Sequence, residues 1–206
     1  DVKAILPKHK GEYISELETT VADQTAQITE LEAWKTENAA FAEAMRIKNE
    51  INSYDYLFYG TLLTEGPMLD MSKVTSTQSM FSSCKALSTI PKYDTSSVTN
   101  MASMFDGCQK LTNIPLLDTS SVTDMNHMFD GCSSLVAIPQ IDTSSVTDIY
   151  GMFLNCTQLT EIPLLDLSGT TDIENLVENC ISLTTIPLLD TKHIKRMYST
   201  FSGCSN

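Results

Sequence analysis

The chain has 206 residues, of which 42% are hydrophobic, so it can build an ordered core and general disorder is excluded. Its formal net charge of -13 would repel phosphate backbones and anionic lipid headgroups, so we expect no nucleic-acid partner. No apolar run approaches the ~18 residues of a membrane span, so we expect no membrane insertion.

After a short N-terminal segment (1–11), residues 12–51 carry the heptad pattern of an α-helical coiled coil. We expect this stalk to join copies of the chain through one apolar seam, formed by Ile14, Leu17, Val21, Gln24, Ile28 and Leu31. Ile and Val at one seam position with Leu at the other favour a homodimer. The polar Gln24 leaves a homotrimer open.

Residues 52–66 are expected to be a linker and an N-terminal cap. The aromatic stretch Tyr54–Tyr59 would pack under the first repeat, and Gly66-Pro67 marks the boundary.

A repeat of 24 residues fills the remaining range, 67–206, with about six copies, the last incomplete. Its columns are clearest in three residue types: Cys84, Cys108, Cys132, Cys156, Cys180 and Cys204; Pro67, Pro91, Pro115, Pro139, Pro163 and Pro187; Asp70, Asp94, Asp118, Asp142, Asp166 and Asp190. A unit of this size cannot bury its own apolar face, but stacked units can, so the pattern predicts a solenoid. A stack that stops within a turn would leave core side chains exposed at its end.

Within one repeat, Val122, Met125, Met128 and Phe129 have helical spacing, which predicts a short helix or 3₁₀ segment in each turn. Gly131 and its counterparts, mostly Gly and Asn, would end that helix in the left-handed conformation. The following Cys-x-x-Leu-x-x-Ile segment is expected to be extended. Stacked over successive turns, these segments would form a narrow parallel sheet. The fold class is therefore an α/β solenoid preceded by a coiled coil.

The cysteine and aspartate columns each allow two interpretations. The cysteines could form disulfides between turns, but we favour a ladder of buried, reduced thiols. The aspartates could bind calcium, but we favour carboxylates that accept backbone N–H bonds in the turn that follows them. Of the three histidines, His127 and His193 fall at different points of the repeat, and no catalytic arrangement emerges. We expect no enzyme activity, no metal and no cofactor.

Two columns are candidates for a recognition surface. If the Leu-x-x-Ile segment is a strand on the concave side, the residue before each Ile points outward, which gives a ligand-binding column of Thr89, Asn113, Ala137, Glu161 and Thr185. The second column follows each proline and contains Leu116, Leu164 and Leu188. These leucines could form an exposed apolar strip or tuck against the next turn, and the sequence leaves both open.

Segments such as Leu117–Met125, followed by Met128–Cys132, resemble the leucine-rich repeats of BspA-like bacterial surface proteins, in particular the mycoplasma lipoprotein-associated subtype. The resemblance covers about residues 66–206. It implies a leucine-rich-repeat solenoid used for adhesion or recognition, in a family with members in phage genomes. The stalk segment Glu16–Gln24 is similar to small coiled-coil proteins of Gram-positive phages.

The combined pattern predicts an appendage of a virion or of a bacterial cell surface, such as a fibre, baseplate or adhesin component. The stalk would oligomerise, and the repeats would recognise a glycan or protein of the host surface. Other virion or surface proteins would be further partners of the chain. The alternative is a purely structural capsid or tail decoration protein with no dedicated ligand.

Overall fold

The computed structural model describes residues 21–22, 25, 29 and 51–205, and it divides the chain into two compact units, Asp1–Glu50 and Ile51–Asn206. In the first unit, Val21, Ala22, Thr25 and Thr29 are helical, and the hydroxyl groups of Thr25 and Thr29 each donate to the carbonyl oxygen four residues earlier. Val21 is exposed. The other five seam residues lie outside the described residues, so the coiled coil stays a prediction.

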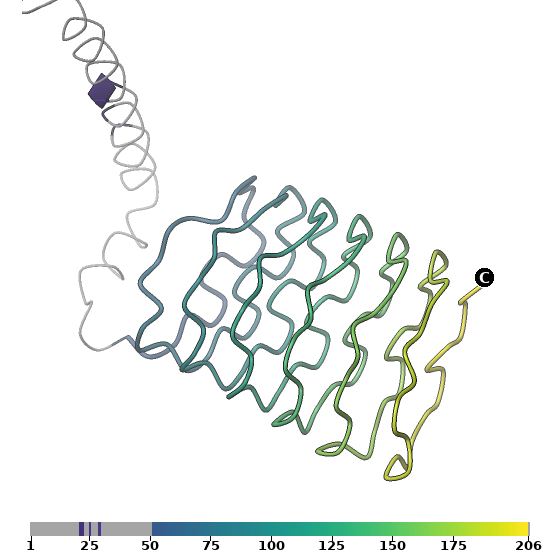
Figure 1. Cartoon of the computed structure of the whole chain (residues 1–206). Coiled ribbons are helices and arrows are strands. Elements are labelled where there is room, and N and C mark those ends of the chain that lie inside the picture. Colours follow the sequence, from purple (N-terminus) through teal and green to yellow (C-terminus); the bar gives the residue numbers. More distant parts are fainter. Residues whose placement is uncertain (1–20, 23–24, 26–28, 30–50, 206) are drawn as a thin grey trace, which may run out of the picture. The chain divides into compact units, whose positions relative to one another are not determined.

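The second unit is a stack of turns that follow one another along an axis (Figure 1). Parallel bridges join successive turns at one column, namely Ser53–Ser76, Ser76–Asn100, Asn100–Asp124, Asp124–Asp148 and Asp172–Arg196. Between residues 51 and 205 the structure has no helix and no strand longer than such a bridge. The stack is nevertheless ordered by its backbone, because alternate N–H groups after each bridge donate to the next turn.

Residues 101–108 show this arrangement. The N–H groups of Met101, Ser103, Phe105 and Gly107 donate to carbonyl oxygens of the next turn over 2.7–2.9 Å. The intervening N–H groups, those of Met104, Asp106 and Cys108, donate to the carbonyl three residues earlier. Each turn of the solenoid therefore contains several overlapping β-turns, each closed by a hydrogen bond between residues three apart.

The predicted short helix is wrong, and backbone conformation gives the reason. Two positions four residues apart have positive φ in every turn, as His127 (50°) and Gly131 (67°) do. The Gly131 column was expected to be left-handed, and it is. The second column reverses the path within the expected helix, and it contains Ser79, Ser103, His127, Gly151, Asn175 and Ser199. Apolar spacing alone could not reveal it.

The core runs along the axis as columns of identical side chains. Rings of Phe58, Phe81, Phe105, Phe129 and Phe153 stack with centroids 5.3–5.8 Å apart. Burial of one such side chain contributes about 1.5–3 kcal/mol, and ring pairing adds about 0.5–1.5 kcal/mol. The first ring of this stack belongs to the expected cap, Tyr54–Tyr59, whose N–H groups bond to the following turn as those of later turns do. Residues 51–66 thus lie in the same compact unit as the repeats.

The cysteine side chains form a second column along the core. Each sulfur donates to a carbonyl oxygen of the preceding turn, as Cys132 Sγ does to Phe105 at 3.1 Å. Cys84 to Cys180 are buried, and Cys204 is half-buried. The cysteine side chains therefore face inward, and their oxidation state stays a prediction.

The predicted parallel sheet is not confirmed, because residues 51–205 contain only isolated parallel bridges. The Leu-x-x-Ile segment forms only two bridges in residues 51–205, Glu65–Thr89 and Glu161–Thr185. Most bridges fall instead at the residue that ends the Val-Thr-x segment. Proline at the end of each Leu-x-x-Ile-Pro segment offers no N–H group for pairing.

The fifth copy keeps the fold despite its different sequence. Leu167-Ser168-Gly169-Thr170 replaces the usual Thr-Ser-Ser-Val, and Thr170 is buried at the valine position. A side chain at Gly169 would collide with the carbonyl oxygen of Val146. Glycine is therefore required where this turn approaches its neighbour closely.

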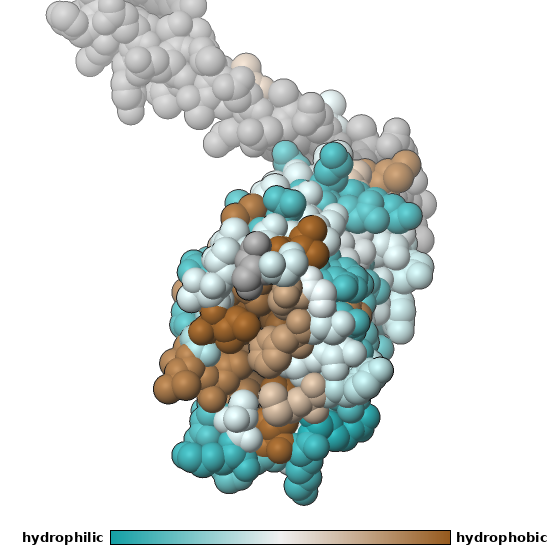
Figure 2. All heavy atoms as spheres, turned by 90° about the vertical axis from the view of Figure 1, so that its right-hand side faces the viewer, coloured by the Kyte–Doolittle hydropathy of each residue, from teal (hydrophilic) through white to brown (hydrophobic). Residues whose placement is uncertain are grey.

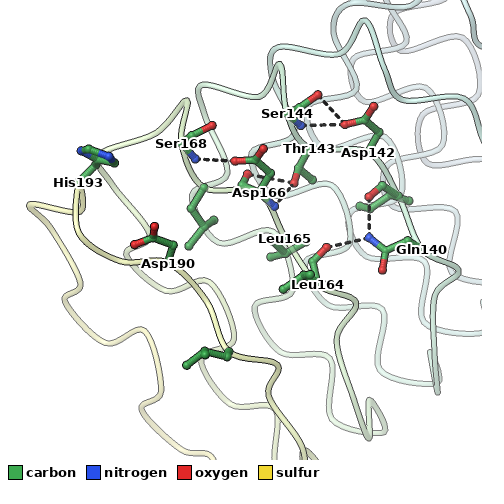
Figure 3. A pocket seen from close by; sticks show the side chains of 13 residues that line it. Gln140, Asp142, Thr143, Ser144, Leu164, Leu165, Asp166, Ser168, Asp190 and His193 are labelled. Carbon is green, nitrogen blue, oxygen red and sulfur yellow. Dashed lines mark hydrogen bonds between the residues drawn. The ribbon is translucent and has the colours of Figure 1, made fainter.

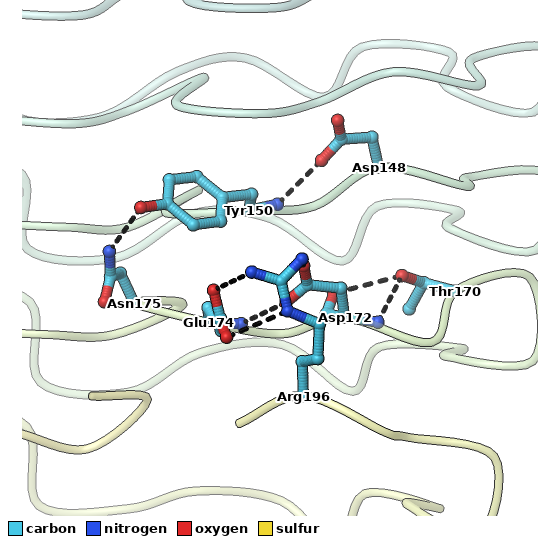
Figure 4. A network of polar contacts seen from close by, with 7 residues as sticks. All are labelled: Asp148, Tyr150, Thr170, Asp172, Glu174, Asn175 and Arg196. Atoms are coloured by element: carbon cyan, nitrogen blue, oxygen red, sulfur yellow. Dashed lines mark hydrogen bonds and ion pairs between the residues drawn. The ribbon is translucent and has the colours of Figure 1, made fainter. Parts of the chain in front are cut away.

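Polar contacts connect the sixth copy to the fifth (Figure 4). The Arg196 guanidinium donates two hydrogen bonds to Glu174, at 3.0 and 2.6 Å, and its third nitrogen lies 3.2 Å from Asp172. Asp172 itself accepts the N–H of Glu174, just as Asp124 and Asp148 accept the N–H two residues on. Asp124, Asp148 and Asp172 thus form a second row of aspartates, separate from the row that follows the prolines.

Apolar side chains gather on the end of the stack that carries the last turn (Figure 2). The exposed large apolar residues of the last copy are Ile186, Leu188, Met197, Tyr198 and Phe201. Ile162, Ile173 and Phe153, which are counterparts of Ile186, Met197 and Phe201 in earlier turns, are buried, whereas Leu164, the counterpart of Leu188, is exposed. The core therefore reaches the surface at this end.

Candidate functional site

The aspartate after each proline forms a corner of the turn. Asp118 Oδ1 accepts the Ser120 N–H at 3.1 Å and the Ser120 hydroxyl at 2.7 Å, and Asp142 and Ser144 repeat this pair. The hydroxyl and then the N–H of the serine lower the pKa of these carboxyls below the ordinary value. The carboxylates therefore act as predicted, as caps of their own turns, and they are ionised at neutral pH.

A buried threonine column holds these corners in line. Thr119 Oγ1 donates to the Asp142 carbonyl at 2.8 Å and accepts the Asp142 N–H at 2.9 Å. Thr143 makes the same two bonds to Asp166. Leu167 replaces threonine in the next copy and contributes an apolar side chain instead. The threonine hydroxyls thus fix the backbone of the aspartates Asp142 and Asp166 to the preceding turn.

The column that follows the prolines is exposed. The exposed fractions are 54% for Leu116, 56% for Leu164 and 95% for Leu188. Lys92 and Gln140, in the same column, are exposed as well. The structure therefore decides between the two alternatives for Leu116 and Leu164, which lie on the surface and do not tuck against the turn that follows them. Together with Leu188 they form the leucine strip.

A groove separates the leucine column from the aspartate corners (Figure 3). It consists of two hollows of about 750 and 650 Å³, and Gln140 and Asp142 line both. Gln140 Nε2 donates to the Leu164 carbonyl at 2.7 Å, which fixes this side chain across the boundary between the hollows. Residues that line the larger hollow come from three successive turns: 140–144, 164–168, and Leu188, Asp190 and His193. The groove therefore crosses the turns.

The charge around the groove has one sign over most of its length. Residues 111–191 contain eleven Asp and Glu residues and no Lys or Arg. Lys92 stands at one end of the groove, and Lys192 bonds to Asp190 at the other. The arrangement can attract cations and accommodate apolar groups, and it would repel anionic ligands.

The predicted ligand-binding column lies outside this groove. Four of its members, Thr89, Asn113, Glu161 and Thr185, are exposed, and Ala137 is half-buried. None of them lines either hollow. Their role in binding stays a prediction. The residues that sequence reasoning missed are Gln140 and His193, because nothing in their spacing distinguishes a groove from a flat surface.

Of the two histidines in residues 51–205, His193 lines the larger hollow and His127 lies outside both hollows. His127 Nδ1 lies 3.1 Å from Asp130 Oδ2, and its ring packs edge-on against Tyr150, away from both hollows. The hydrogen bond to Asp130 raises the pKa of His127 above the ordinary value. Within the described residues, no group of three or more His, Cys, Asp or Glu side chains is placed to hold a metal ion. Among those residues there is also no helix with the length and hydropathy of a membrane span.

The repeat region is similar to known proteins in structure and in sequence. The chain is similar to a leucine-rich repeat protein from Eubacterium ventriosum of known crystal structure, with 22% identity and a TM-score of 0.49. That similarity covers 71% of this chain and 44% of the other, so the chain spans less than half of that protein's length. The curated proteins provide no match. A model of the DUF285 family, described as Mycoplasma protein of unknown function, matches residues 55–161 and 112–206. Because these matches together cover well over half of the sequence, the chain belongs to the DUF285 family.

Proposed function

We propose that this chain is a recognition component displayed on a virion or a bacterial cell surface. The groove between the leucine strip and the aspartate corners carries the proposal. Exposed leucines that occupy the same place in three turns, two of them adjacent, cost solvation free energy, and a fold of this regularity could carry polar residues there at no loss, as it does at Gln140. Recognition of a partner gives them a use.

The proposal includes oligomerisation of the stalk. The seam from Ile14 to Leu31 would join two or three copies, so that several grooves act on one target at once. Its partners would be other virion or surface proteins on one side and a glycan or protein of the host surface on the other. Catalysis, a metal and a cofactor have no part in this function.

Display and binding are tested together with the full chain. An antibody raised against the chain should label intact virions or cells, and the labelled chain should adsorb to cells of a susceptible strain. Replacement of Leu116, Leu164 and Leu188 by serine should reduce adsorption, since all three are exposed and none is needed for the core. The absence of surface labelling would reject the proposal.

A purely structural decoration protein is the second candidate. It is favoured by the aspartate row, because each Oδ1 already serves its own turn and needs no ligand to be satisfied. On that alternative, the antibody should label the particle surface, but the chain should adsorb to no cell. The leucine substitutions should then change only the solubility of the chain.

A further inference from the structure

We propose that the groove binds an extended peptide segment of a partner protein in which lysine or arginine side chains alternate with apolar ones. This inference rests on the proposed function and specifies its ligand. It follows from three features of the groove: an apolar wall, an anionic wall, and a length that fits a short extended chain.

The apolar wall is formed by the leucine strip. Leu164, Leu167 and Leu188 all line the larger hollow, and Leu167 is buried whereas the other two are exposed. The exposed surfaces of the two outer leucines are available for contact, since each is more than half exposed. An apolar ligand side chain between them would remove surface from water on both partners.

The anionic wall has unused bonding capacity. Asp142 and Asp166 accept their serine partners through Oδ1. Their Oδ2 atoms have no hydrogen-bond or ion-pair partner among residues 51–205. Both carboxyls have a pKa below the ordinary value, so each offers an ionised oxygen to a cation. Because residues 111–191 contain no Lys or Arg, no internal cation from this stretch competes for them.

The same charges argue against other ligands. A phosphate-rich or sialylated polymer would meet a continuous row of carboxylates. Neutral sugars usually stack on exposed aromatic rings, but Tyr93, the aromatic residue among those lining the hollows, is buried, and its hydroxyl donates to Pro67. A cationic and partly apolar peptide matches both walls.

The length of the groove sets the size of the segment. The hollows run from Lys92 to His193, across five successive turns. With ~4.8 Å between turns this is ~20 Å, which an extended peptide of about six residues spans at ~3.3 Å each. Alternate side chains of such a peptide point to opposite walls. Lys92 would repel cations at its end, so the basic side chains should occupy the larger hollow.

The test uses the full chain and a fluorescein-labelled peptide of eight alternating lysine and leucine residues, with binding followed by fluorescence anisotropy. The alternating lysine–leucine peptide should bind, and binding should weaken as salt is raised. A glutamate–leucine peptide should not bind. A lysine–serine peptide should bind about tenfold more weakly, because it lacks the apolar contacts. Equal binding of all three peptides would overturn the proposal.

Two matched double variants locate the site. Asp142→Asn with Asp166→Asn removes two charges from the groove but keeps an oxygen acceptor for the serine N–H groups, so the turns stay capped. This variant should bind the lysine–leucine peptide about tenfold more weakly. Asp124→Asn with Asp148→Asn removes the same charge from caps outside the groove and should leave the affinity unchanged. If both variants weaken binding equally, the attraction is unspecific and the proposal is wrong.

The outcomes separate this inference from the proposed function. A chain that binds no lysine–leucine peptide but adsorbs to cells through Leu116, Leu164 and Leu188 would disprove the peptide ligand and leave the recognition role intact. A chain that binds the peptide at the groove but is never displayed at a surface would do the reverse. Circular dichroism of each variant verifies that the solenoid is folded in both experiments.

Discussion

The thiol of Cys132 donates a hydrogen bond to the carbonyl oxygen of Phe105, 3.1 Å away in the preceding turn. The same bond recurs down the column, so the sulfurs act as small buried donors that join neighbouring turns. A covalent link between two such thiols would remove the donors from their carbonyl partners. The geometry therefore favours a reduced column.

Thiol reactivity tests this directly. Burial raises the pKa of Cys132 well above the ordinary value, and the same cause raises that of Cys180 to about 12. Because the thiolate is the reactive form, a thiol reagent at neutral pH should modify the half-buried Cys204 first and Cys132 last. In denaturant all six cysteines should react. A denatured count near zero would reveal a disulfide ladder.

Substitution of Gly131 tests the left-handed column. Gly131 has a φ of 67°, and an added Cβ would meet its nearest neighbours at 3.6 Å, so space does not limit the substitution. Gly131→Ala should lower the free energy of unfolding by about 1–2 kcal/mol, since alanine resists this conformation. Gly131→Asn should cost less, because asparagine tolerates it, as Asn155 and Asn179 do. Equal losses in urea denaturation would contradict the assignment.

These positions also show what the sequence could predict. The spacing of Val122, Met125, Met128 and Phe129 correctly identified four buried side chains. It could not identify the backbone between them, because His127 reverses the path while the apolar residues still face inward. The signal was present in the column of Ser79, Ser103, His127, Gly151, Asn175 and Ser199, whose members are mostly small or tolerant of positive φ.

The candidate site was predictable only in part. The 24-residue period showed that Leu116, Leu164 and Leu188 share one place in the repeat, but periodicity does not distinguish exposed from covered positions. A hollow depends on how the main chain bends between that column and the Asp corners. That bend is a tertiary property, set by contacts such as the one from Thr143 to Asp166 in the next turn.

His127 should make stability depend on pH. Its hydrogen bond to Asp130, and the nearby charges of Asp106 and Asp148, raise the pKa of His127 in the folded state above the ordinary 6.5. The stabilisation is therefore complete below the unfolded pKa and is lost as pH rises through the folded value. His127→Asn, which suits the positive φ, should lower the melting temperature more at about pH 5.5 than at about pH 9. An equal effect at both pH values would refute this coupling.

Leu17→Asp should separate the copies of the chain. The carboxylate would lie in the expected seam, where it cannot be solvated. Light scattering should show a dimer or trimer for the unchanged chain and a monomer for the variant. Glu18→Gln, outside the seam, is the matched control. Melting of the solenoid should not change, because its compact unit starts at Ile51. A monomeric unchanged chain would disprove the coiled coil.

Asn113→Arg combined with Glu161→Arg distinguishes the two candidate recognition surfaces. Both side chains are exposed, and Glu161 pairs with Thr185 through the backbone, so neither change should disturb the core. The double variant should melt within about 2 °C of the unchanged chain, as surface substitutions usually do. If it unfolds, the outward orientation of this column is wrong.

Binding by the same variant then assigns the surface. If the groove is the recognition site, the double variant should adsorb to cells as well as the unchanged chain, while Leu164→Ser with Leu188→Ser should adsorb poorly. If the column of Thr89, Asn113, Ala137, Glu161 and Thr185 is the site, the two new arginines should abolish adsorption, because long charged side chains would replace two of five neighbouring contacts. In that case the leucine variant should bind normally, and the groove would lose its proposed role.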